Sequence, residues 1–425
     1  MKNIFKVLLI LALLVSSKNI FAMESLSERC FSIVDSQSSD LAQEVIDTWP
    51  NVEGIKHFLT YPVEWQDIFI KHLKIFAEKR WPVQTGANFL KIQSIEDDSL
   101  GCIEFVRITP DKKIIIIGFK DKVIKILSLD CDQKYNLHQT LEGYRGWTSS
   151  LVLTSDKRMI LSAIDGIVNI WFLGDDGFYK LHPFSINEMG SNICTIDISL
   201  DKSLIICGSI SGSLDQYIKI YSRCENGNFS LVQEIHEKYL GQPRIVISGD
   251  KKVFACGYTY GAVKIFRLQE DGSYSEIQKF KEVMTNIRDI VISEDGKVVA
   301  YGGPDIPIKV LSLGKNGEYF LMQELKNESH NGWFDCIYMS SDKKMIVAGF
   351  NNGLIDVWML GNKGYYLVKS FKGHDNSVSD VYASFHEKTI VSSDIDGRIF
   401  IWQNHSLLDD LDLPQTLDFL QNNCF

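Results

Sequence analysis

The residues that could perform chemistry in this chain are charged side chains in or beside short apolar runs: Glu104, Arg107, Asp197, Arg244, Arg288, Asp289, Asp335 and Asp380. Clustered carboxylates can hold a metal ion or act as general acids and bases. Acids and bases are mixed here, which favours salt bridges over a metal site. No GxxxxGK[ST], HExxH or GxSxG motif occurs, and the nine histidines are dispersed. We therefore predict no catalytic residue and no cofactor or metal.

Two tryptophans are the strongest candidates for recognition of a partner. Trp147 and Trp333 each follow a glycine in a segment that leads into an apolar run. Exposed loops on a rigid scaffold often carry recognition residues, and Trp is enriched in binding hot spots. The alternative is a Trp packed between structural elements. Together with Arg244, Asp289 and Asp335, these tryptophans form the predicted partner-binding set.

An internal repeat determines how these residues are positioned. A turn of the form Ser/Thr-x-Asp, followed in most copies by Lys, recurs between two apolar runs at intervals of 44 to 49 residues. The turn position is occupied by Asp111, Asp156, Asp201, Asp250, Asp295, Asp342 and, in an irregular seventh copy, His386. A repeat of this length can hold four short strands and their turns, as a propeller blade does.

Each copy predicts four strands. Two apolar columns precede the turn, for example Val106 and Ile108, and alternate positions on a strand share one buried face. A third strand ends in a large residue such as Trp171, Trp358 or Trp402. Fourth strands follow Gly-containing turns that accept positive φ angles. They are predicted at Tyr179–Phe184, Phe229–Ile235, Tyr274–Phe280, Tyr319–Leu325 and Tyr365–Phe371.

These features resemble the WD-repeat propeller family over residues 87–403. The seventh copy carries the resemblance most clearly, with Gly373-His374, Ser392, Asp396-Gly397 and Trp402. The resemblance implies a buried hydrogen-bonded network of His374, Ser392, Asp396 and Trp402 in that copy. The sixth copy keeps His330, Asn352 and Trp358 but has Ala348 at the Ser position. No copy has Asp after its Trp, which departs from the family's pattern, whereas the period is kept in all seven copies.

Ring closure is also predicted. Asn88–Ile95 is similar to a fourth strand but precedes the first complete copy, whereas the last copy stops at Gln403 without one. An early strand that completes the last blade would join the two ends of the ring and pair an open sheet edge. We therefore predict an all-β, seven-bladed propeller closed by an N-terminal strand. Some of the charged residues would then line its central channel.

Three segments flank the predicted ring. Residues 1–22 have Lys2 and Lys6, an apolar run too short to span a bilayer, and a small residue at Ala22, which is the layout of a secretory signal peptide. A buried helix or an uncleaved anchor is the alternative. Residues 23–86 are predicted to be helical, either a cap on the ring or a separate binding module. Residues 404–425 form an acidic tail.

The net charge and the internal repeat together limit the possible classes of function. The formal net charge of −10 disfavours a nucleic-acid partner, which requires a basic surface. We expect an exported, monomeric, non-catalytic scaffold that binds a protein or peptide and has no stable membrane span. One alternative is an enzyme with a metal or cofactor in the channel. Another is an intracellular adaptor of the F-box type, in which residues 24–86 recruit a partner and the propeller recognises a second one.

Overall fold

The computed structural model describes residues 89–404, except 97–101, 121–122, 142–147, 188–190, 213–214, 283–284, 327–331, 362 and 385–388. The predicted signal peptide, the predicted helical segment and residues 405–425 of the predicted tail lie outside the described residues. The chain divides into units of residues 1–85 and 86–425, and every described strand belongs to the second. Within the described ranges there is no helix, and hence none of the length and hydropathy needed to cross a membrane.

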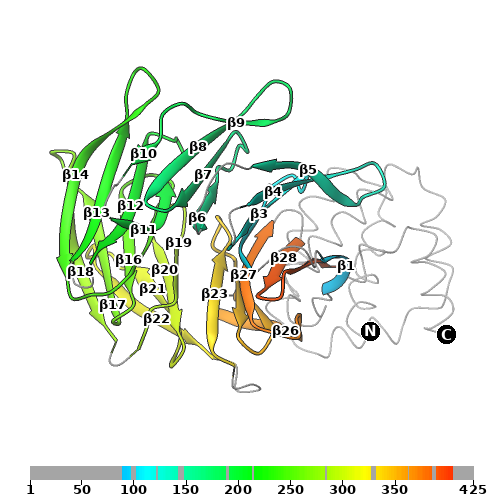
Figure 1. Ribbon diagram of the computed structural model, residues 1–425. Coiled ribbons are helices and arrows are strands. Elements are labelled where there is room, and N and C mark those ends of the chain that lie inside the picture. The colour runs from blue at the N-terminus through cyan, green and yellow to red at the C-terminus, as the bar shows by residue number, and fades with distance from the viewer. Residues whose placement is uncertain are drawn as a thin grey trace, which may run out of the picture. The chain divides into compact units, whose positions relative to one another are not determined.

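Seven antiparallel sheets, or blades, are arranged around a common axis in the described part of the chain (Figure 1). Blade 1 contains β2 (Ile103–Ile108), β3 (Ile114–Phe119), β4 (Ile124–Leu129) and β5 (Tyr135–Leu141). Blade 2 contains β6 (Thr148–Leu153), β7 (Met159–Ile164), β8 (Ile167–Leu173), β9 (Tyr179–Leu181) and β10 (Ile186–Asn187). Blade 3 contains β11 (Asn192–Ile198), β12 (Leu204–Ser211), β13 (Asp215–Arg223) and β14 (Phe229–Lys238).

The remaining blades repeat this order. Blade 4 contains β15 (Pro243–Ile247), β16 (Val253–Tyr258), β17 (Ala262–Leu268) and β18 (Tyr274–Lys281). Blade 5 contains β19 (Asp289–Ile292), β20 (Val298–Gly303), β21 (Ile306–Leu313) and β22 (Tyr319–Leu325). Blade 6 contains β23 (Phe334–Met339), β24 (Met345–Phe350), β25 (Leu354–Gly361) and β26 (Gly364–Lys372). Blade 7 contains β27 (Val378–Ser384), β28 (Thr389–Asp394), β29 (Arg398–Asn404) and β1 (Phe89–Glu96). The predicted seven-bladed fold is confirmed.

The ring closes through β1, as the sequence predicts. This strand pairs antiparallel with β29, with Lys91 opposite Trp402 and Ile95 opposite Ile399. The blue β1 accordingly lies beside the orange and red strands of the C-terminal end in Figure 1. One blade thus takes strands from both ends of the described chain, which pairs the outer edge of β29.

The recurring Ser/Thr-x-Asp turn is held by its own side chains. In blade 1, Thr109 Oγ1 donates to Asp111 Oδ1 at 2.7 Å and accepts the N–H of Ile114 at 3.1 Å. The intervening Lys112 has a φ of +56°, which most residues avoid. Equivalent lysines with positive φ are Lys157, Lys202, Lys251 and Lys343. The motif therefore recurs because its two side chains stabilise an otherwise unfavourable turn.

The fourth strand of blade 2 departs from the prediction of a continuous strand at Tyr179–Phe184. It is split into β9 and β10, which pair with different parts of β8. The last regular bond before the break runs from the N–H of His182 to the carbonyl of Ile170 at 2.7 Å. Pro183 follows and has no N–H to donate, so it interrupts the ladder.

The hydrophobic core lies between neighbouring blades. One cluster joins Ile116 and Ile126 of blade 1 to Leu151 and Trp171 of blade 2, and similar clusters fill the other junctions. In most blades the second strand is buried at every position, as in β7 and β16, because both faces of the blade pack against neighbouring blades. Blade packing therefore fixes how far each inner strand lies from the axis.

Two polar contacts recur at these junctions, one between outer strands and one between the turns that follow the inner strands. A Gln on the outer strand of one blade donates to and accepts from the backbone of a Tyr on the next, as with Gln139 and Tyr179 at 2.8 Å in both directions. Gln233, Gln278 and Gln323 form the same pair with Tyr274, Tyr319 and Tyr365. In addition, the turn lysine of one blade pairs with the turn Asp of the preceding blade, as Lys251 does with Asp201 at 2.6 Å.

Candidate functional site

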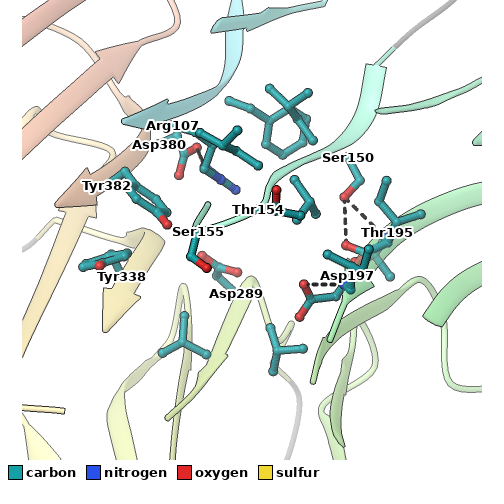
Figure 2. Close-up of a pocket in the computed structure, with 18 of the residues that line it drawn as sticks. Arg107, Ser150, Thr154, Ser155, Thr195, Asp197, Asp289, Tyr338, Asp380 and Tyr382 are labelled. Atoms are coloured by element: carbon teal, nitrogen blue, oxygen red, sulfur yellow. Dashed lines mark hydrogen bonds and ion pairs between the residues drawn. The ribbon is translucent and has the colours of Figure 1, made fainter. Parts of the chain in front are cut away.

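A cavity of about 390 Å³ lies on the axis, where all seven innermost strands meet (Figure 2). These strands are β2, β6, β11, β15, β19, β23 and β27. Their apolar columns, such as Val106 and Ile108, face into the blades, so the alternate residues face the axis. The turns after the inner strands also contribute to the wall, through Ser155, Leu200 and Ser341. The cavity therefore occupies the end of the channel at which those turns lie.

One axial position of the inner strand links four of the seven blades to the next by a side-chain acceptor. Ser150 and Thr195 accept the N–H groups of Ile196 and Ile245 at 3.1 and 3.3 Å. Asp289 and Asp380 accept those of Ile337 and Val106, both at 2.9 Å. In blade 4 this position is Arg244, which has no acceptor atom. Phe105 in blade 1 and Cys336 in blade 6 occupy the same position and do not accept an N–H from the next blade either, so Arg244 is the charged residue that departs from the pattern.

Arg107 and Asp380 form an ion pair across the closure of the ring, between blades 1 and 7. The Arg107 guanidinium lies 5.3 Å from the centre of the Tyr382 ring, whose own centre is 4.5 Å from that of Tyr338. Burial acts to lower the pKa of Arg107, but Asp380 outweighs it and the pKa is raised. Burial raises the pKa of Asp380, and Arg107 offsets only part of this. The mutual salt bridging that the sequence favoured therefore occurs at this pair.

Asp197 and Asp289 lie on other parts of the cavity wall. Each accepts two backbone N–H groups: Asp197 those of Ile198 and Ile247, both at 2.8 Å, and Asp289 those of Ile290 and Ile337, both at 2.9 Å. Burial raises the pKa of each carboxyl to about 6. Within the described residues neither carboxylate has an ion-pair partner. Figure 2 shows both on the walls of the same space as the Arg107–Asp380 pair.

The other predicted channel charges lie elsewhere. Arg288 Nε is 3.4 Å from Asp335 Oδ1, and Ser377 Oγ donates to Asp335 Oδ2 at 2.5 Å. Neither residue belongs to the cavity wall, nor does Glu104. The predicted partner-binding set is therefore divided, because Arg244 and Asp289 face the cavity, whereas Asp335 lies near the start of β23 in a local ion pair.

Trp333 is exposed and its backbone is held in place. Its relative exposure is 58%. The N–H of Trp333 donates to Asn351 Oδ1 at 2.7 Å, and the N–H of Asn351 donates to the carbonyl of Trp333 at 2.9 Å. A large aromatic side chain is thereby presented to solvent from a fixed position. Trp147, the other predicted recognition residue, lies outside the described residues.

The seventh blade contains a buried network that differs from the predicted one in a single member. Trp402 Nε1 donates to Ser392 Oγ at 2.8 Å, Ser392 Oγ bonds His374 Nε2 at 2.6 Å, and His374 Nδ1 bonds Asp394 Oδ2 at 2.9 Å. The prediction of Asp396 was wrong. Ser392 and Asp394 share one face of β28 because alternate residues do, whereas Asp396 lies in the turn and accepts from Asn376 at 3.2 Å.

The sixth copy is arranged differently. Asn352 Oδ1 accepts the N–H of Leu354 at 3.2 Å, so within the described residues it caps its own turn and is not bonded to Trp358. Trp358 is buried, and Ala348 replaces the serine that accepts an indole N–H in blade 7. His330 lies outside the described residues. Without the serine hydroxyl, Asn352 and Trp358 have no shared partner of the kind that joins the network in blade 7.

Several wall residues were missed from the sequence: Ser150, Thr195, Tyr338 and Tyr382. The available signal was the alternation of the inner strands. Once the buried columns are known, the residues between them must face the axis. Among the described residues, no three His, Cys, Asp or Glu side chains are grouped as a metal site, and the seven cysteines there are free.

Comparison with known proteins identifies the class. Residues 365–403 match the model of the family described as "WD domain, G-beta repeat". This segment, which includes the His374 network, is thus similar to a WD repeat, and the described residues fold as a seven-bladed β-propeller. The crystal structure of the β-propeller domain of Cps50 (Swd1) from Myceliophteria thermophila is similar, with a TM-score of 0.59 and 16% sequence identity over 74% of this chain and 99% of that chain. A comparison with curated protein sequences finds no match.

Proposed function

We propose that this chain is a non-catalytic scaffold that binds a protein or peptide through the face on which Trp333 lies. WD-repeat propellers are typical protein-interaction scaffolds, and the propeller fold supports that class of function here. The observation that carries the proposal is Trp333, an exposed aromatic residue on a loop whose backbone is fixed by Asn351. A rigid aromatic anchor loses little conformational entropy on binding.

The composition of the surrounding surface agrees with this use. Arg288 is half-exposed beside Asp335, and both lie at the same end of the inner strands as Trp333. Interfaces typically combine an aromatic anchor with polar groups at the rim. We propose that the chain is a monomer and that the side chains of this face bind the partner, rather than strand addition to an outer strand.

The test compares Trp333→Ala with Phe320→Ala. Phe320 is also an exposed aromatic, at 53%, but it lies on the outer strand β22. Proteins that cross-link to the intact chain in its native cells should no longer cross-link to Trp333→Ala, because its affinity for them should fall at least about tenfold. The same proteins should still cross-link to Phe320→Ala. If both variants retain the same partners at the same yield, Trp333 is not the anchor.

We also propose that the scaffold is exported. The support is the layout of residues 1–22, with two lysines, a short apolar run and a small residue at Ala22. The mature chain should then begin near Met23. N-terminal sequencing of the protein from the secreted or periplasmic fraction checks this, and a chain that retains Met1 and stays in the cytoplasm would contradict it.

A further inference from the structure

Besides Glu294, which is exposed in the turn after β19, three charged residues that line the axial cavity form no ion pair within the described residues. Arg107 is neutralised by Asp380, and Arg288 by Asp335 outside the cavity. Asp197 and Asp289 accept only backbone N–H groups, and the Arg244 side chain has neither an ion pair nor a hydrogen bond there. All three line the same cavity. Charges held out of bulk water without partners are costly, and the cost is reduced when a ligand pairs with them.

Ring assembly accounts for part of this arrangement but not for Arg244. At its position, Ser150, Thr195, Asp289 and Asp380 accept an N–H from the next blade. A guanidinium only donates, so Arg244 cannot make this contact. The N–H of Ile290 in the next blade is instead bonded to Asp289 Oδ1 at 2.9 Å. Arg244 thus places five N–H donors at the cavity without serving the junction between blades 4 and 5.

We propose that the axial cavity binds a small zwitterion of the α-amino-acid class, with the ligand carboxylate on Arg244 and the ligand ammonium on Asp289 and Asp197. A ligand that carries both charges matches unpaired groups of both signs without changing the net charge of the cavity. A cation alone would leave Arg244 unpaired, and an anion alone would leave the two carboxylates unpaired.

The cavity suits such a ligand in size and lining. Its volume of about 390 Å³ is in the range of small-molecule sites. Tyr338 and Tyr382 supply an aromatic wall, and Val152, Val246 and Val291 supply apolar surface for a side chain. Each carboxylate oxygen that accepts one N–H retains a lone pair for an ammonium donor. Charge-assisted bonds of this kind are stronger than neutral ones.

The site is independent of the proposed partner-binding face. Trp333 directly precedes β23, whereas Ser341 of the cavity wall follows that strand. Ile337 and Tyr338 of β23 also line the cavity, and Trp333 is not part of its wall. Failure of one proposal therefore leaves the other standing, and Trp333→Ala should not alter binding in the cavity.

The first test is binding of the twenty common L-amino acids to the purified chain, by calorimetry or ligand-observed NMR. At least one should bind with one-to-one stoichiometry. Its amide, which keeps only the positive charge, and its N-acetyl derivative, which keeps only the negative charge, should each bind at least about tenfold more weakly. The proposal is overturned if no amino acid binds at about 10 mM, or if either single-charge derivative binds as well as its parent.

Variants then assign the charges. Arg244→Gln and Asp289→Asn should each weaken binding by at least about tenfold. Arg158→Gln and Asp175→Asn make the same chemical changes at exposed positions outside the cavity and should leave binding unchanged. The Arg244 side chain makes no hydrogen bond to the next blade, and its charge only acts on Asp289 through space, so this variant remains informative if Asp289→Asn lowers the thermal stability. Unchanged affinity in Arg244→Gln would overturn the assignment.

Discussion

Two aspartates separated by one residue have different environments at the end of β28. Asp394 is fully buried and bonds His374, whereas Asp396 is in the exposed turn. Burial acts to raise the pKa of Asp394, but hydrogen bonds from His374 and from the N–H groups of Arg398 and Asp396 outweigh it and lower the pKa. Asp394 therefore stays ionised and keeps the His374 proton on Nδ1, which leaves Nε2 free to accept from Ser392.

Ser392 is the residue on which this network depends most. Ser392→Ala should lower the free energy of unfolding by about 2–4 kcal/mol, because it leaves the Trp402 N–H and His374 Nε2 buried without partners. Ser393→Ala is the matched control, since Ser393 is equally buried but only bonds the Ser379 hydroxyl at 2.9 Å, and it should cost about 1 kcal/mol. Denaturant unfolding measures both. Equal losses would mean that the network contributes nothing specific.

Asp197 and Asp289 predict an unusual pH dependence. Their folded pKa values of about 6 exceed the unfolded value of about 4, so the folded chain binds more protons between these limits. Their contribution to stability is complete below about pH 4 and is lost as the pH rises through 6. The free energy of unfolding of Asp197→Asn, relative to that of the unsubstituted chain, should therefore be higher at pH 7.5 than at pH 4.5 by about 1–2 kcal/mol. Thermal melts at both pH values decide this, and a difference that does not change with pH contradicts it.

At the scale of elements, the junctions between blades are held by the same few side-chain contacts. The Gln that pairs with a Tyr backbone occurs four residues after the first aromatic residue of an outer strand, as in Tyr135 and Gln139. In β1 the same spacing separates Phe89 from Gln93, and Gln93 pairs with Tyr135 of blade 1 at 3.2 and 3.0 Å. The closing strand therefore contributes to two interfaces, the sheet of blade 7 and the junction with blade 1.

Gln93→Ala tests this second interface. It removes both bonds to the backbone of Tyr135 and should lower the free energy of unfolding by about 1–3 kcal/mol. Ile92→Ala changes the adjacent exposed side chain and should have an effect within about 0.5 kcal/mol. Chemical unfolding of the two variants provides the comparison. If Gln93→Ala is as mild as Ile92→Ala, the Gln contacts do not hold the ring together.

For the whole molecule, closure by β1 predicts which N-terminal truncation the ring tolerates. Deleting residues 24–97 removes β1, leaves blade 7 with three strands and opens the edge of β29. The melting temperature should fall by at least about 10 °C. Deleting residues 24–84 retains β1 and should lower the melting temperature much less. Equal melting temperatures for the two truncations would be incompatible with closure through β1.

The sequence alone determined the number of blades and the closing strand. The Ser/Thr-x-Asp turn and the apolar columns around it depend on contacts within about ten residues, so they recur visibly in each copy. The similarity of Asn88–Ile95 to a fourth strand could be recognised in the sequence for the same reason. The break in the fourth strand of blade 2 also has a local cause, because Pro183 is present in the sequence. Whether a proline interrupts a strand depends on whether the neighbouring strand needs its N–H group, which the sequence does not specify.

The tertiary structure decided which charges pair. Arg107 and Asp380 are 273 residues apart and meet only because the ring closes, which no local pattern encodes. The same holds for Asp197, Asp289 and Arg244, whose lack of ionic partners depends on how seven strands from separate repeats surround one axis. Asp394 replaced Asp396 in the network because Asp394 shares one face of β28 with Ser392, whereas Asp396 lies in the turn. The turns and strands of a repeat were thus predictable, whereas the pairing of side chains distant in the sequence required the fold.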